Sequence, residues 1–227
     1  MIGILAGMGP KSTGPFVDKV VEQCQKIYGA KYDIDFPHMM IYSCPTPFYI
    51  DRSIDHNEMK LAIIKGVQKL ESIGVDFIAI PCNTAHIYFQ EIQYSSSVPV
   101  LNMVEETIKQ LPKHSKKVAL LATEPTVQSE IYQKAMMNHK LDYIQKSSWQ
   151  LYVNEIISKI KTGQINESIQ LWHELQLDLS NSVDSVVVAC TDINVIFNHN
   201  QYDLHFVDSS TCLAQAIVKK YLSISNS

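Results

Sequence analysis

The sequence predicts an α/β protein made of two similar Rossmann-like α/β domains, each with a parallel sheet. Short apolar, β-branched runs alternate with helical periods along the chain, which is typical of strands joined by crossover helices. Residues 74–84 and 182–192 resemble each other: in both, Val-Asp leads into an apolar run that ends in cysteine. Two further pairs of similar segments follow the same order. These repeats predict a tandem duplication, with domains related by a pseudo-twofold axis and a site between them.

The first half shows the alternation of strand and helix signals clearly. Helical periods predict two helices, and the second carries Met59, Ile63 and Val67 on one face. Prolines between residues 44 and 47 exclude a helix or a central strand and so predict a loop. We expect strands at 2–6, 39–43, 77–81 and 98–103, and helices at 14–28 and 56–73.

The second half repeats this scheme, and Gly163 has the position of a helix C-cap. We expect strands at 117–122, 142–144, 183–189 and 204–207, and helices at 126–137, 151–162, 165–181 and 211–223. The first domain would then span residues 1–103 and the second residues 104–210. The last helix, within 211–227, would pack back on the first domain.

The two repeats each place a cysteine at the carboxyl end of a buried strand, Cys82 in the first half and Cys190 in the second. Ligands bind at that edge of open α/β sheets. A lone buried cysteine is most often a small hydrophobe, but the repetition favours chemistry. Two thiols on opposite walls of a cleft suit a reaction that needs an acid and a base on opposite faces of one carbon. Helices beginning after both cysteines are expected to lower the pKa of each thiol.

The other cysteines lack this setting. Cys24 and Cys212 lie on expected helix faces and are interpreted as packing residues, whereas Cys44 lies in a loop that could approach the cleft. Five cysteines without a CxxC pair indicate neither a disulfide scaffold nor a metal site.

Composition narrows the class of protein. The chain has 227 residues, 46% of them hydrophobic, and a net charge of −4 without a basic block, which argues against nucleic-acid binding. No apolar run reaches the roughly 20 residues that span a bilayer, so no membrane partner is expected. The N-terminus lacks a cationic segment and is interpreted as a strand rather than a signal peptide, which predicts a cytoplasmic protein.

A glycine-rich turn follows the first strand, with Met8 and Gly9 at its centre. The dinucleotide fingerprint requires a glycine where this chain has Ser12 and an acidic residue where the next strand ends at Ser43. A nicotinamide cofactor is therefore not expected. The turn could bind an anion through backbone N–H groups or could simply be a tight connection.

Two cationic residues and a histidine are further candidates for the functional site. Arg52 follows the proline-rich loop and is either a solvated charge or a bidentate carboxylate ligand. Lys161 could favour a helix C-terminus electrostatically. His86, four residues after Cys82, is either an ordinary helix residue or a partner of the thiolate.

The motifs resemble those of the aspartate/glutamate racemase family, the pyridoxal-phosphate-independent amino-acid racemases, in its aspartate-racemase branch. The paired cysteine motifs are the specific part, and the similar segments run in family order over nearly the whole chain. These segments are residues 4–10, 50–52, 81–86, 121–123 with Thr126 and Tyr132, 160–163, 189–192 and 207–208.

The resemblance implies two similar α/β domains with the active site between them, no cofactor and, as is common in the family, a homodimer. Cys82 and Cys190 would be the catalytic acid/bases, and Arg52 and Lys161 would hold substrate carboxylates. The residues implied to line the site are Met8, Gly9, Asn83, Thr84, Thr123, Thr191 and Asp192.

Some positions depart from the family pattern. Ala189 and Asp192 stand where Gly and Glu are usual, and the loop before Asp51-Arg52 is longer and more aromatic. These changes affect substrate identity rather than chemistry. Two candidate cations, where an α-carboxylate needs one, predict a small acidic amino acid as the substrate, aspartate ahead of glutamate.

The expected activity is cofactor-independent racemisation by two cysteines. A cysteine-dependent lyase or isomerase related to arylmalonate decarboxylase or maleate isomerase is an alternative, since those chemistries use one or two thiols. A non-catalytic small-molecule binding protein is another, because it would need the cleft and Arg52 but neither thiol.

Overall fold

A computed structural model describes residues 1–48, 53–196 and 204–225 of the chain. The chain divides into two compact units. Unit 1 comprises Met1–Met103 together with Ser210–Ser227, and unit 2 comprises Val104–Ser209. Both are α/β units with parallel sheets, as the sequence predicts.

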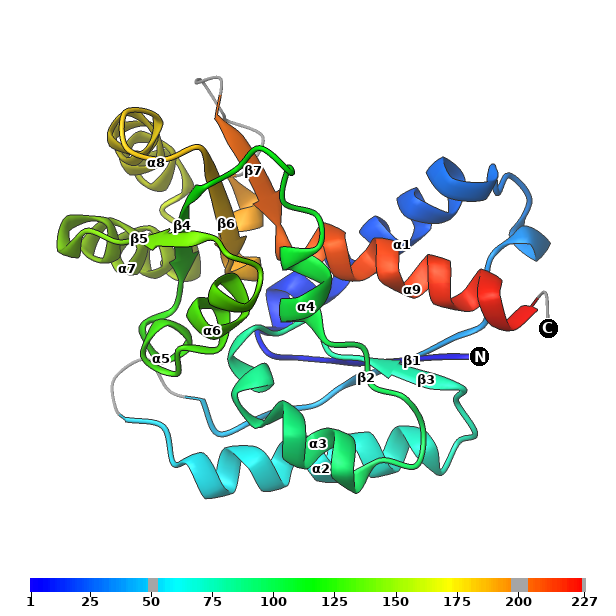
Figure 1. Cartoon of the computed structure of the whole chain (residues 1–227). Coiled ribbons are helices and arrows are strands. Elements are labelled where there is room, and N and C mark those ends of the chain that lie inside the picture. The colour runs from blue at the N-terminus through cyan, green and yellow to red at the C-terminus, as the bar shows by residue number, and fades with distance from the viewer. Residues whose placement is uncertain (49–52, 197–203, 226–227) are drawn as a thin grey trace. The chain divides into compact units, whose positions relative to one another are not determined.

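Unit 1 holds a three-stranded parallel sheet in the order β2-β1-β3, in which β1 (Ile2–Ala6) is central. Helices α2 and α3 cover one face of this sheet, and α1 and α9 cover the other (Figure 1). The remaining bounds are β2 Met39–Ser43, β3 Phe77–Ala79, α1 Thr13–Tyr28, α2 His56–Glu71, α3 Phe89–Ser95 and α9 Ser209–Ser225.

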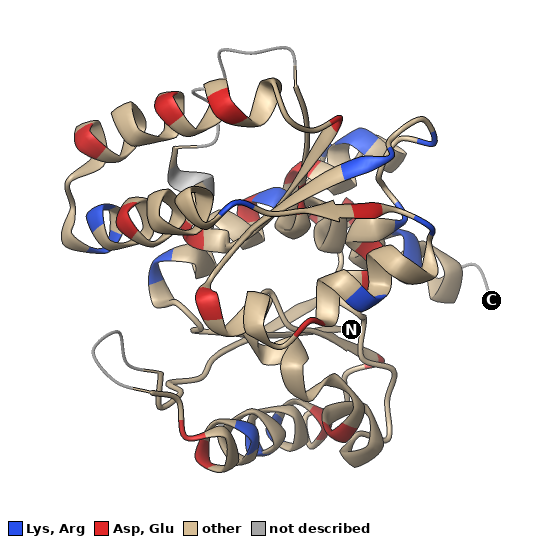
Figure 2. Cartoon of the chain, turned by 60° about the vertical axis from the view of Figure 1, so that its left-hand side comes forward, with Lys and Arg blue, Asp and Glu red and all other residues tan. Residues whose placement is uncertain are grey.

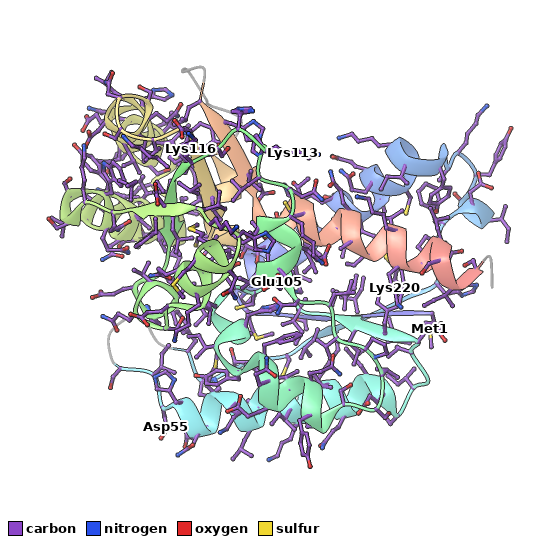
Figure 3. The ribbon with its side chains drawn as sticks, viewed as in Figure 1. Met1, Asp55, Glu105, Lys113, Lys116 and Lys220 are labelled. Carbon is purple, nitrogen blue, oxygen red and sulfur yellow. The ribbon has the colours of Figure 1, made fainter. Side chains whose placement is uncertain are left out.

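The period of the sequence explains why these elements pack as they do. In β1 every residue is buried: Leu5 packs in the core under α2, and Ile4 in the core under α1 and α9. The expected apolar stripe of α2 is confirmed, since Met59, Ile63 and Val67 are fully buried. Asp55, labelled at the start of α2 in Figure 3, caps this helix by accepting from the backbone N–H groups of Asn57 and Glu58 at 2.9 and 3.0 Å.

Unit 2 holds a four-stranded parallel sheet in the order β5-β4-β6-β7. Helices α7 and α8 cover one face with fully buried Trp149 and Trp172, while α4 and α6 cover the other (Figure 1). The bounds are β4 Lys117–Ala122, β5 Asp142–Ile144, β6 Ser185–Ala189, β7 His205–Asp208, α4 Met103–Ile108, α5 Glu124–Gln128, α6 Ile131–Asn138, α7 Ser147–Thr162 and α8 Ile165–Ser180.

The two sheets share one strand order: the first strand of each unit is central, with the second strand on one side and the third on the other. The expected strand at 98–103 is wrong, because only Val100 pairs, in a single bridge to Ile78. Glu71 holds the preceding turn by accepting from the Ser97 backbone N–H at 2.5 Å. Since α4 begins at Met103, little extended chain remains between turn and helix.

Helix boundaries differ from expectation at several places. The single helix expected at 126–137 is two helices, α5 and α6, because Glu130 adopts a left-handed conformation with φ 60° between them. Helix α7 begins at Ser147 rather than at Leu151. Its predicted C-cap is confirmed, because Gly163 has φ 85°.

Charged residues lie mainly on the helices and loops, with both signs interspersed, while the strands carry few of them (Figure 2). Among the described residues, no helix is long and apolar enough to cross a membrane.

Candidate functional site

In unit 1, the turn after β1 brings Met8 and Gly9 to the carboxyl edge of the sheet. Gly7 begins this turn with φ 94°, and a Cβ added there would lie 2.6 Å from the backbone N and O of Cys44. The Gly7 N–H donates to Thr13 Oγ1 at 3.2 Å, and the Ser12 hydroxyl donates to the Gly9 carbonyl at 2.8 Å. The turn is therefore close-packed against the residue that follows β2.

Cys82 lies just beyond β3 at the same edge and is 9% exposed. Its side chain packs in one core cluster with Met8. Asn83 and Thr84 are buried too, so three of the sequence-predicted residues follow one another here. A five-residue 3-10 helix, Thr84–Tyr88, begins two residues after Cys82, and α3 follows it directly at Phe89.

His86 contacts the backbone of Cys82 through the carbonyl oxygen of that residue. Its Nδ1 lies 2.9 Å from the Cys82 carbonyl oxygen, and its Nε2 accepts from the Met103 backbone N–H at 3.0 Å. The ring is 3% exposed, and burial lowers the pKa of His86, so the imidazole is neutral.

Tyr88 and His56 form a polar pair that sequence reasoning missed. The Tyr88 hydroxyl lies 2.8 Å from His56 Nδ1 and is largely buried. Burial, and then the negative charges of Asp55 and of ionised Cys82, raise the pKa of Tyr88 to about 12. The sequence gives one signal for Tyr88 as a site residue, namely its position at the end of the short helix that begins after Cys82. It gives no signal for the pairing with His56, which is 32 residues away in the chain.

In unit 2, Cys190 directly follows β6 and is 6% exposed. Burial, and then the charge of Asp192, raise the pKa of Cys190 to about 12. Hydrogen bonds from the backbone N–H groups of Asp192 and Ile193, and the charge of Lys161, act in the opposite direction. The expected lowering is therefore wrong for Cys190: the element after it is a short 3-10 helix, and desolvation outweighs its N–H groups.

Lys161 and Asp192 form an ion pair beside Cys190. Lys161 Nζ lies 3.5 Å from Asp192 Oδ2, with side chains 26% and 15% exposed. The lysine comes from the last turn of α7, and the aspartate from the 3-10 helix Thr191–Val195. Lys161, predicted as a carboxylate ligand, and Asp192, predicted to line the site, thus contact each other, and Thr191 is the chain neighbour of Asp192.

Thr123 follows β4 at the N-cap position of α5. Its hydroxyl lies 2.9 Å from that of Thr126, and the Gln150 side chain donates to the Ala122 carbonyl at 3.1 Å. The carboxyl edge of the second sheet thus gathers Thr123 from β4 and Cys190 from β6.

The other residues that the sequence singles out are either buried in the core or lie outside the residues that the structure describes. Cys24 and Cys212 are buried in the core, as the sequence predicts. Cys44 is buried as well; its sulfur lies 3.8 and 3.9 Å from the carbonyl oxygens of Pro45 and Ala62, and burial raises its pKa. Arg52 lies outside the described residues. The described residues contain no group of three or more His, Cys, Asp or Glu side chains suited to a metal ion.

Comparison with known proteins identifies the family of the chain. Residues 5–217 match the family model of Asp/Glu/hydantoin racemases. The Picrophilus torridus aspartate racemase has a similar structure, with a TM-score of 0.83 and 31% identity over 96% of this chain and 93% of that one. An aspartate racemase homologue from Pyrococcus horikoshii shares the fold, with a TM-score of 0.78 at 22% identity over 96% of this chain and 97% of that one. These are two-domain α/β racemases.

A curated relative is closer in sequence. The chain is 56% identical to the broad specificity amino-acid racemase RacX of Bacillus subtilis, over 98% of this chain and 99% of that protein. It is 27% identical to the glutamate racemase of Aquifex pyrophilus over 65% of this chain and 59% of that one. The chain belongs to the Asp/Glu/hydantoin racemase family. It is accordingly a racemase, an enzyme of the isomerase class, and the resemblance stated from its motifs is confirmed.

Proposed function

We propose that the chain racemises amino acids by a two-base mechanism in which Cys82 and Cys190 act on opposite faces of the α-carbon, without a cofactor. The main support for the two-base mechanism is that each thiol occupies the same place in a repeated topology. Cys190 directly follows the third strand of unit 2, and Cys82 lies three residues after the last residue of the third strand of unit 1. A five-residue 3-10 helix comes after each cysteine. Packing alone does not require a cysteine at both places.

The protonation states support a division of roles. Cys190 is a thiol at neutral pH, because burial and Asp192 raise its pKa to about 12. In one direction, the Cys82 thiolate takes the α-proton as the C–H bond breaks, and Cys190 delivers its S–H proton to the opposite face. The reverse direction exchanges the roles. The backbone N–H groups of Asp192 and Ile193 are placed to stabilise negative charge that develops beside Cys190.

The substrate proposal combines two observations. The similarity to the Picrophilus torridus aspartate racemase supports aspartate ahead of glutamate among acidic amino acids. The ion pair with Asp192, however, gives Lys161 a counter-ion within the chain, so the lysine does not need a carboxylate from the substrate. We therefore propose a range that includes neutral amino acids, in keeping with the name of the Bacillus subtilis relative.

The proposal extends to a cytoplasmic homodimer. None of the five cysteines, all of which are described, forms a disulfide, which suits a reducing compartment. The homodimer rests on the family resemblance. Size-exclusion chromatography with light scattering tests the oligomer.

The test of the activity is incubation in D2O with a panel of acidic and neutral amino acids, followed by mass spectrometry and chiral chromatography. We expect α-deuterium in both enantiomers. Loss of carbon dioxide or of a β-substituent without inversion would instead assign the lyase chemistry. Binding without any exchange, unchanged in Cys82→Ser, would assign a binding protein.

Arg52 is proposed to bind the α-carboxylate, on the family motif. Arg52→Lys should lower kcat/KM by about 10- to 100-fold, because lysine cannot form the planar bidentate pair. Steady-state kinetics of both enantiomers checks this. Kinetics equal to those of the unaltered enzyme would place Arg52 away from the substrate.

A further inference from the structure

We propose that His86 is a positioning residue for Cys82. Its neutral imidazole connects the Cys82 carbonyl to the first peptide of α4 and so fixes the direction in which the thiol points. This inference rests on the proposed function, in which Cys82 acts on the α-carbon of the substrate. It assigns a role to a buried titratable side chain that the two-thiol mechanism leaves unused.

The geometry determines the tautomer. A backbone N–H only donates, and that of Met103 points at His86 Nε2 at 3.0 Å, so Nε2 carries a lone pair. The proton of the neutral ring therefore lies on Nδ1, which donates to the Cys82 carbonyl oxygen at 2.9 Å. The Leu101 carbonyl oxygen also lies near Nε2, but farther away, at 3.4 Å. A proton on Nε2 pointing toward it would replace the shorter bond from the Met103 N–H.

The ring has little freedom to move. His86 stacks on Phe89 with the ring centroids 5.7 Å apart and the planes 6° from parallel. The side chain is 3% exposed, and desolvation lowers its pKa. Protonation of Nε2 would replace the acceptor for the Met103 N–H by a donor. The Leu101 carbonyl oxygen, 3.4 Å from Nε2, could accept the added proton, but burial outweighs this contact and favours the neutral ring.

The consequence for Cys82 follows from its two peptide groups. The Cys82 N–H donates to the Ile80 carbonyl at 2.8 Å, and the Cys82 carbonyl accepts from His86. With the peptides on both sides of its Cα held, the main freedom left to the thiol is rotation about χ1. His86 supplies the second of these two restraints.

The second thiol is held differently. The Cys190 carbonyl accepts from the Ile193 backbone N–H at 3.1 Å, which is a bond within its own 3-10 helix. In unit 1 the corresponding restraint comes from a side chain that also contacts Met103, the last residue of the first segment of that unit. The imidazole thus connects the position of Cys82 to the place where the chain passes from unit 1 to unit 2.

Two amide variants separate the two bonds of the ring. In His86→Asn, the amide nitrogen takes the place of Nδ1 and still donates to the Cys82 carbonyl. In His86→Gln, the amide reaches the place of Nε2 and keeps an acceptor for the Met103 N–H. The readout is the rate of iodoacetamide alkylation of each of the five cysteines in the ligand-free protein, measured by peptide mass spectrometry. Thermal unfolding verifies that both variants fold.

We expect His86→Gln to change the alkylation rate of Cys82 by about fivefold or more, with the other four cysteines unchanged, and His86→Asn to stay within about twofold of the unaltered protein. On the substrates turned over, His86→Gln should lower kcat by about 10- to 100-fold with little change in KM, and His86→Asn should recover most of that loss.

Three results would overturn the inference: equal alkylation of Cys82 in both variants, no change in either, or a parallel rise at all five cysteines, which would indicate a structural role only. Because the alkylation assay needs no substrate, failure of the proposed racemisation in the unaltered protein would be seen separately from failure of this inference.

Discussion

Cys82 and Cys190 occupy the same place in the two units but have different neighbours. In the described part of unit 1, a buried, neutral His86 contacts the Cys82 backbone, and burial raises the pKa of Tyr88. Beside Cys190 lies the ion pair of Lys161 and Asp192. The repeated topology thus preserves the strand and the thiol, while the residues after the thiol have diverged.

This difference matters for the proposed two-base mechanism, which starts with one cysteine as a thiol and the other as a thiolate. The charge of Asp192 and burial favour the protonated form of Cys190. Two identical surroundings would favour the same protonation state at both cysteines, so divergence is itself useful for an exchange of roles.

The turns after the first strands differ as well. In unit 1, Gly7 has φ 94° and its Cα lies against the Cys44 backbone. In unit 2 the corresponding position is Thr123, with φ −61° and ψ 149°, which any residue adopts. Only the turn in unit 1 therefore depends on a glycine.

The largest effect should come from removing either thiol. Cys82→Ala and Cys190→Ala should each lower racemisation by about 10³-fold or more, because one face then loses its acid/base. Each variant should still exchange the α-proton of one enantiomer with D2O, and the two variants should differ in which enantiomer that is. Substantial racemisation by either variant would contradict the two-base assignment.

The next effect concerns the turns. Gly7→Ala should lower the free energy of unfolding by about 2–3 kcal/mol, because the new Cβ meets backbone and alanine disfavours a positive φ. Gly14→Ala is the matched control, since a Cβ there has no atom within 4 Å and the position is helical. It should be neutral or stabilising by up to about 1 kcal/mol. Urea denaturation measures both, and equal values would show that the Gly7 turn relaxes easily.

The sequence was sufficient for the bounds of β1, β2, β4 and β5, and for the positions of both cysteines after the third strands. It was not sufficient at 98–103, where the expected strand is a single bridge. It could not indicate the two contacts of His86, because Cys82 and Met103 are brought to one ring only by the fold. The sign of the pKa shift at Cys190 was missed for a similar reason. Burial of the thiol decides that sign, and the residues after Cys190 do not reveal it.

The charge difference also predicts how Cys190 reacts with pH. With a pKa of about 12, its thiolate fraction rises about tenfold per pH unit and does not level off near 9, where an ordinary thiol does. Between pH 7 and 10 the alkylation rate of Cys190 should therefore keep rising, as measured by peptide mass spectrometry of the folded protein. A plateau below pH 9 would mean that the cation and the backbone N–H groups outweigh burial.

The smallest effect expected is that of Asp192→Asn, which removes the carboxylate that pairs with Lys161 while keeping the side-chain shape. A substrate carboxylate would then take that place, so the ratio of kcat/KM for aspartate to that for alanine should rise about fivefold, the effect of a partly exposed ion pair worth about 1 kcal/mol. Glu167→Gln is the control, since it removes the partner of Lys159 in a different ion pair, which joins α7 to α8, and it should leave the ratio unchanged. An unchanged ratio in Asp192→Asn would mean that Lys161 does not face the substrate side chain. A rise confined to Asp192→Asn would assign the breadth of the substrate range to this aspartate.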